Sequence, residues 1–126
     1  MMNAAKKTLL ASLAVGLIAG AAGIAQADAR QDFSILNSTG APVVSLYVSS
    51  HDDNNWGDDV LGADILANGQ TANIHFDSST NPSQCAWDIK LVDSAGANWV
   101  VPSVDLCHVS AMTFLRRGNH VVYQTR

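Results

Sequence analysis

The stretch that decides the fold is Ala86-Trp-Asp-Ile-Lys-Leu-Val92, in which apolar and charged residues alternate from Trp87 to Leu91. Successive side chains of a β-strand point to opposite faces, so this pattern predicts a strand that is buried on one side only. We expect Trp87, Ile89 and Leu91 to face a core and the two charged residues between them to face solvent. A core with two such layers is typical of a small β-domain.

The same period-2 alternation continues on both sides of this strand, and no window shows a sustained helical period. Turn residues separate the segments, and the first two look like a hairpin across Ser38–Pro42. The pattern predicts an all-β fold, a small antiparallel β-sandwich of roughly seven or eight short strands. The further predicted strands are Phe33–Asn37, Val43–Ser49, Thr71–Asp77, Asn98–Val101, Val104–Cys107, Thr113–Leu115 and His120–Thr125.

The N-terminal residues read as a leader. Lys6 and Lys7 precede an apolar stretch, Leu9–Ile24, and Ala25-Gln-Ala27 is a small-x-small cleavage site. We therefore predict a cleaved signal peptide at residues 1–27 and a single mature domain at 28–126, which is periplasmic or secreted. No cysteine stands directly after the apolar stretch, at the cleavage site, so we expect no membrane anchor after cleavage.

Two cysteines, Cys85 and Cys107, are the only ones in the chain. An exported protein matures in an oxidising compartment, so we predict a disulfide between them. Closing this loop would stabilise the fold by about 3 kcal/mol on the chain-entropy model. A redox-active pair is the alternative, although such pairs are usually spaced as C-x-x-C.

The charge balance of the chain is acidic. All eleven acidic residues are Asp, and the formal net charge of −4 becomes −6 once the two leader lysines are lost. An acidic surface repels nucleic acid and anionic membrane, so neither is an expected partner. Cations remain as expected partners, and solubility alone is the other reason for such a surface.

The stretch Asp52–Asp64 holds five of the eleven acidic residues. Carboxylate and amide oxygens suit hard cations, so the stretch predicts a loop that binds calcium or a lanthanide ion. It is not an EF-hand, because Trp56 and Ala63 stand where that loop requires oxygen ligands. Two copies sharing one ion would give a metal-bridged homodimer. The candidate ligands are Asp52, Asp53, Asn54, Asp58, Asp59 and Asp64.

The same loop has two other interpretations. It could be a solvated turn in which Asp58 or Asp59 caps a short helix through Leu61. Trp56 could fold back over the core, or it could stand exposed as a contact for protein or glycan.

The remaining polar residues carry no catalytic signature. The histidines His51, His75, His108 and His120 show no ligand spacing, although His75 and His120 could meet in space to hold zinc or copper. Nucleophile elbows, zinc-protease helices and phosphate-binding glycine loops are absent from the sequence. We therefore do not expect an enzyme.

Five short motifs stand out along the mature chain: Asn37-x-Thr39-Gly40, Leu46-Tyr-Val-Ser49, Trp56-Gly-x-Asp59-x-Leu61-Gly62, Cys85-x-Trp87-Asp-Ile89 and Asp105-Leu-Cys107. They resemble the motifs of a family of small exported bacterial β-proteins without an established general function. The resemblance covers nearly the whole mature chain and implies that Trp56–Gly62 is largely a structural turn. More loosely, the chain is similar in size, predicted export and acidic loop to periplasmic metal-trafficking proteins, including those that handle lanthanides in methylotrophs.

Together these features predict a non-catalytic periplasmic or secreted binding protein whose acidic loop takes a hard cation. The alternative is an envelope interaction module that binds protein or glycan through Trp56 and the neighbouring loops.

Overall fold

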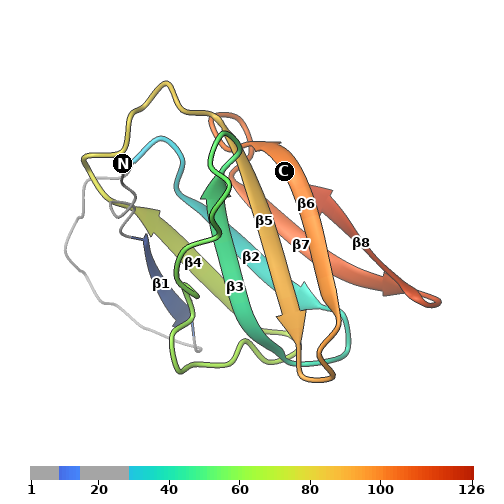
Figure 1. Cartoon of the computed structure of the whole chain (residues 1–126). Coiled ribbons are helices and arrows are strands. Elements are labelled where there is room, and N and C mark those ends of the chain that lie inside the picture. Colours follow the sequence, from blue (N-terminus) through green and yellow to red (C-terminus); the bar gives the residue numbers. More distant parts are fainter. Residues whose placement is uncertain (1–8, 15–28) are drawn as a thin grey trace.

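The computed structural model describes residues 9–14 and 29–126, and these form two β-sheets packed face to face (Figure 1). One sheet has five strands in the order β1-β4-β2-β7-β8, and the other has three in the order β3-β5-β6. The strands are β1 (Leu9–Ala14), β2 (Phe33–Ser38), β3 (Val43–Ser50), β4 (Thr71–Phe76), β5 (Ala86–Asp93), β6 (Asn98–Asp105), β7 (Ala111–Arg117) and β8 (His120–Thr125).

The predicted all-β sandwich is confirmed, and β5 has the orientation that its sequence predicts. Trp87, Ile89 and Leu91 are buried in the single apolar core between the sheets. The rings of Phe76 and Trp87 meet edge to face with centroids 4.8 Å apart, which joins the two sheets across that core. Alternation in β5 is therefore a consequence of burying one face against the larger sheet.

The predicted hairpin between the first two mature strands is wrong. β2 and β3 belong to different sheets, and β2 pairs antiparallel with β4 and parallel with β7. The buried Asn37 side chain holds the crossing, because its Nδ2 donates to the carbonyls of Ala41 and Leu66 at 2.8 and 3.0 Å. Its Oδ1 accepts from the Thr39 amide. The turn residues thus direct the chain from one sheet to the other.

The segments predicted at Asn98–Val101 and Val104–Cys107 are one strand, β6, which continues through Pro102. Proline is tolerated there because β6 is the edge of its sheet and no further strand requires the missing N–H. The pairing with β5 shifts register between Trp87 and Ile89, and Ser103 has a positive φ of 55°. This register shift includes Asp88, whose side chain is described below with the acidic loop between β3 and β4.

The predicted disulfide is confirmed. Cys85 precedes β5 and Cys107 follows β6, and their Cα atoms are 5.1 Å apart. The bond joins the ends of two paired strands, so it stabilises the smaller sheet at the end where β3 also stops. Both cysteines of the chain are in this bond.

The signal-peptide prediction for residues 1–27 lies largely outside the described residues and stays a prediction. Its described part, Leu9–Ala14, is strand β1 at the edge of the larger sheet (Figure 1). Within the described ranges, the chain contains no helix that is long and apolar enough to span a membrane.

Candidate functional site

The acidic loop connects β3 to β4 and runs along the free edge of β3. Its second half, Asp58–Asp64, is bonded to that strand: the Val60 amide donates to the Leu46 carbonyl at 2.8 Å. Oδ1 of Asp59 accepts from the amides of Leu46 and Leu61, both at 2.9 Å. Leu61 is buried in the core. Asp59 therefore supports the backbone, and the helix it was expected to cap is replaced by turns.

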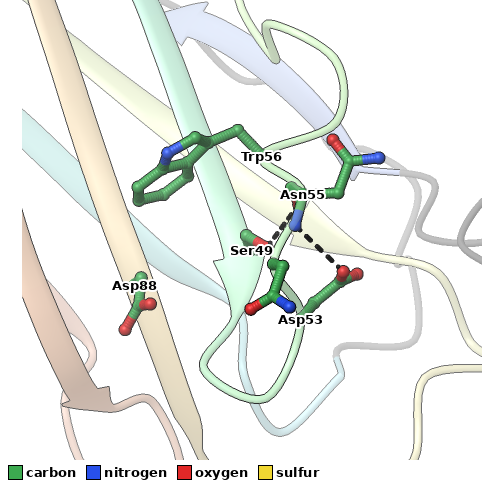
Figure 2. Close-up of a pocket in the computed structure, with 6 residues that line it drawn as sticks. Ser49, Asp53, Asn55, Trp56 and Asp88 are labelled. Carbon is green, nitrogen blue, oxygen red and sulfur yellow. Dashed lines mark hydrogen bonds between the residues drawn. The ribbon is translucent and has the colours of Figure 1, made fainter.

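The first half of the loop, Asp52–Gly57, is held by hydrogen bonds from its own short side chains and from Ser49. Asp53 Oδ1 accepts from the Asn55 amide at 3.1 Å, and Asn55 Oδ1 accepts from the Gly57 amide at 3.2 Å. Ser49, buried at the end of β3, donates its hydroxyl to the Asn55 carbonyl at 2.9 Å (Figure 2). Such side-chain-to-backbone bonds favour a compact turn over a helix. The positive φ of Gly57, 74°, completes the turn.

A cavity of ≈ 140 Å³ lies between this turn and β5. Figure 2 shows Asp53 on the loop and Asp88 on β5. Its lining combines one indole with five hydrogen-bonding side chains. The lining residues are Ser49, Asp53, Asn54, Asn55, Trp56 and Asp88.

Trp56 does not cover the core. It lies half-buried over the outer face of the smaller sheet, where its ring centroid is 6.4 Å from that of Tyr47. The Lys90 ammonium nitrogen is 5.2 Å from the Trp56 ring centroid and 4.9 Å from the Tyr47 centroid. Tyr47 and Lys90 are cross-strand partners on that face. The indole is thus positioned by an aromatic contact and a cation–π contact beside the cavity.

Asp88 is held in the cavity by two hydrogen bonds. Its Oδ1 accepts from His51 Nδ1 at 2.7 Å and from the Ser103 amide at 2.9 Å. Burial opposes ionisation of Asp88, but these two hydrogen bonds outweigh it and hold the pKa of the carboxyl below its ordinary value. The hydrogen bond to Asp88 raises the pKa of His51 above its ordinary value. Asp88 is therefore an ionised acceptor at neutral pH.

The structure separates the predicted cation ligands. Asp53 and Asn54 line the cavity, Asp59 is committed to backbone amides, and the remaining three are exposed outside the lining. In the described part of the chain, one group of three side chains brings metal-ligating atoms of His, Cys, Asp or Glu within 4.8 Å of one another. It consists of Cys85, Asp105 and Cys107, and both sulfurs are already in the disulfide. The exposed three are Asp52, Asp58 and Asp64.

The histidines do not form a shared site. Those at 51, 75 and 108 each pair with an Asp, at 2.7, 3.2 and 2.9 Å respectively. His75 lies on β4 and His120 on β8, and β2 and β7 separate these strands. The expectation that His75 and His120 could meet is therefore wrong.

The sequence pointed to the Asp52–Asp64 loop, and two cavity residues, Ser49 and Asp88, lie outside that loop. Alternation along β5 indicated that Asp88 faces outward, and Ser49 closes a predicted strand. What the sequence does not reveal is the pairing of β3 with β5, which makes Ser49 and Asp88 register partners. That pairing brings a strand acid beside the loop.

Comparisons with known proteins add no relative, since no protein-family model, curated protein or solved structure matches this chain.

Proposed function

We propose that this protein is a non-catalytic, exported binding module and that the Trp56 cavity is its ligand site. One observation carries the proposal: a single cavity sets an indole beside two carboxylates, two amides and a hydroxyl. The proposal takes up the interaction-module alternative from the sequence and assigns ligand binding to this one cavity.

A hydroxyl-rich ligand suits this lining best. Sugar hydroxyls both donate and accept, so they match carboxylate acceptors as well as amide donors. The C–H faces of a sugar ring are apolar enough to lie against an indole. The cavity is smaller than the 300–1,000 Å³ typical of drug-sized ligand sites. We therefore propose that it takes a single sugar unit, such as the end of a glycan chain.

The lining is held in place before any ligand arrives. Trp56 rests on Tyr47 and Lys90, Asp88 is fixed by two hydrogen bonds, and Ser49 holds the turn. Little conformational entropy of these side chains is then lost on binding, so a few contacts can give measurable affinity.

A hard cation is the second candidate, and one observation favours it. Asp53 and Asp88 come from different segments and line the same cavity, together with the amide side chains of Asn54 and Asn55. We propose this narrower oxygen set, in place of the whole acidic loop, for calcium or a lanthanide. The ion-bridged homodimer belongs to this candidate, because four side chains leave coordination positions open.

Isothermal titration calorimetry of the exported protein tests both candidates. The probes are a panel of hexoses and N-acetylhexosamines, then calcium chloride, then lanthanum chloride. Sugar heat that disappears in both Trp56→Ala and Asp88→Asn supports the glycan proposal. Ion heat that disappears in Asp53→Asn but persists in Trp56→Ala supports the cation candidate.

Asp58→Asn is the matched control, because it makes the same charge change on an exposed residue of the same loop outside the cavity. It should bind like the natural sequence. An equal loss in Asp58→Asn and Asp53→Asn would mean that only the net charge matters. Absence of heat with every probe at millimolar concentration would contradict both candidates.

A further inference from the structure

The outer edge of β4 is occupied by a strand from the predicted leader. β1 pairs antiparallel along the whole of β4, from Leu9 opposite Phe76 to Ala14 opposite Thr71 (Figure 1). On its other side β4 pairs with β2. If residues 1–27 are removed after export, as the sequence predicts, β4 becomes the edge of the larger sheet. The inference below rests on that removal and is independent of the Trp56 cavity.

The register shows which backbone groups such an edge would expose. The Asn37 amide donates to the Gln70 carbonyl, and the Phe76 amide donates to Asp32 Oδ1, so even-numbered residues of this segment face β2. In an antiparallel ladder the hydrogen-bonding direction alternates from one residue to the next. The N–H and C=O groups of Thr71, Asn73 and His75 therefore face β1 and are unpaired once β1 is gone.

Of the three other sheet edges, those of β3 and β6 are protected in ways that β4 is not, and the outer edge of β8 is the alternative that the experiments below test. The free edge of β3 is covered by the acidic loop, through the bonds from Val60 to Leu46 and between Val43 and Leu66. The β6 edge carries Pro102. β4 has no proline and no Asp, Glu, Lys or Arg, and its pairing with β1 runs without a register shift. Regular, unprotected edges are the ones that accept another strand.

We propose that the mature protein forms a two-fold symmetric dimer through antiparallel pairing of β4 with the β4 of a second copy. An antiparallel pair of identical strands is self-complementary about a two-fold axis, which is the commonest symmetry of homodimers. With Asn73 opposite the partner's Asn73, Thr71 lies opposite the partner's His75. The three exposed backbone positions then pair among themselves, and no like charges meet.

This register also continues the core. Ala72 lies opposite the partner's Ile74, and both are buried positions on the inner face of the sheet. The two larger sheets therefore merge with their apolar faces on the same side. One six-residue strand is a small contact, so we expect a weak dimer that dissociates on dilution.

Sedimentation velocity of the exported protein over a hundredfold dilution series tests the proposal, after mass spectrometry has located the N-terminus. We expect cleavage after residue 27 and a mass that rises from monomer toward dimer with concentration, unchanged by a chelator. The chelator separates this dimer from an ion-bridged one. A mass that retains residues 9–14, or a monomer throughout the series, would overturn the proposal.

Asn73→Pro removes an edge-facing N–H and should weaken dimerisation at least tenfold. Its matched control is Thr125→Pro on β8: Ala111 and Arg126 exchange backbone hydrogen bonds, so the Thr125 N–H faces the outer edge of β8. This variant should dimerise like the natural sequence. Equal behaviour of the two variants would contradict β4 pairing.

Hydrogen exchange on the unmodified protein keeps the test independent of variant folding. The amides of Thr71, Asn73 and His75 should gain protection as concentration rises, whereas those of Ala72 and Ile74 stay protected throughout. Protection that appears instead at Val121, Tyr123 and Thr125 would place the contact on β8 and overturn the proposal.

Discussion

The two halves of the acidic loop use the same side chain in different ways. In the second half, Asp59 turns inward and caps two backbone amides, which fastens the loop to β3. In the first half, Asp53 closes a short turn and also lines a cavity opposite Asp88. A count of carboxylates therefore does not locate a site. What matters is whether each carboxylate accepts hydrogen bonds from the backbone amides of the scaffold or lies beside other polar side chains in a cavity.

Asp59→Ala is expected to lower the free energy of unfolding more than any other substitution considered. The amides of Leu46 and Leu61 lose their acceptor, and each poorly solvated N–H left unpaired costs on the order of 1–3 kcal/mol. We expect the free energy of unfolding to fall by about 3 kcal/mol, measured by urea denaturation. Asp58→Ala is the control and should stay within about 0.5 kcal/mol of the natural sequence. Similar losses in both variants would remove the distinction between the two halves.

Trp56→Ala has a smaller effect on stability. The ring contact with Tyr47 and the cation–π contact with Lys90 are lost, which together cost about 1.5 kcal/mol. The fold should persist, since Trp56 lies outside the buried core. Urea denaturation followed by far-ultraviolet circular dichroism measures this. A loss above about 3 kcal/mol would show that Trp56 is part of the scaffold rather than of the first half.

Ser49→Ala should cost about 1 kcal/mol, because one hydrogen bond to the Asn55 carbonyl disappears from a buried position. The first half of the loop should then loosen while the second half stays in place. Amide hydrogen exchange checks this: residues 53–57 should exchange faster, and Val60 and Leu61 should not. Faster exchange across the entire loop would mean that the halves are coupled.

The smallest expected effect is the pH response of His51. Its hydrogen bond to Asp88 raises its pKa above 6.5, so the pair stabilises the fold fully below pH 6.5. That contribution is lost as pH rises through the raised pKa. Conversely, the Asp88 contribution is present above pH 3.8 and is lost as pH falls through its lowered pKa.

Histidine titration by NMR measures this response directly. We expect the His51 midpoint to lie above 6.5 in the natural sequence and to fall in Asp88→Asn, which removes the carboxylate that favours the charged ring. An unchanged midpoint in Asp88→Asn would contradict the contact. Asp105→Asn is the matched control, because Asp105 bonds His108 instead.

Local patterns predicted much of the fold. The alternation of Trp87, Ile89 and Leu91 identified the buried face of β5, and the two cysteines predicted the disulfide. The hairpin of β2 and β3 was predicted wrongly, because turn residues at 38–42 suit a hairpin and a sheet crossing equally well. The difference depends on Asn37, whose side chain reaches Leu66, 29 residues away in sequence.

The candidate site was only half predictable. The loop was visible as a run of Asp and Asn, and Asp53, Asn54 and Trp56 do line the cavity. Residue type alone does not separate Asp58 from Asp59, and only the motif Trp56-Gly-x-Asp59-x-Leu61-Gly62 singled out Asp59. In the structure Asp59 accepts from two backbone amides, whereas Asp58 is exposed. Asp88 could not be placed at the cavity, because its neighbour Ser49 lies far away in sequence.

The sequence by itself determined which side of each strand is apolar, because side chains alternate along a strand whatever lies beside it. It also determined the acidic balance and the presence of a polar loop. Tertiary structure alone decided which strands pair, since that choice depends on contacts between distant segments. The cavity is a result of that choice: Asp88 and Asp53 line the same cavity only because β5 pairs with β3 in one register.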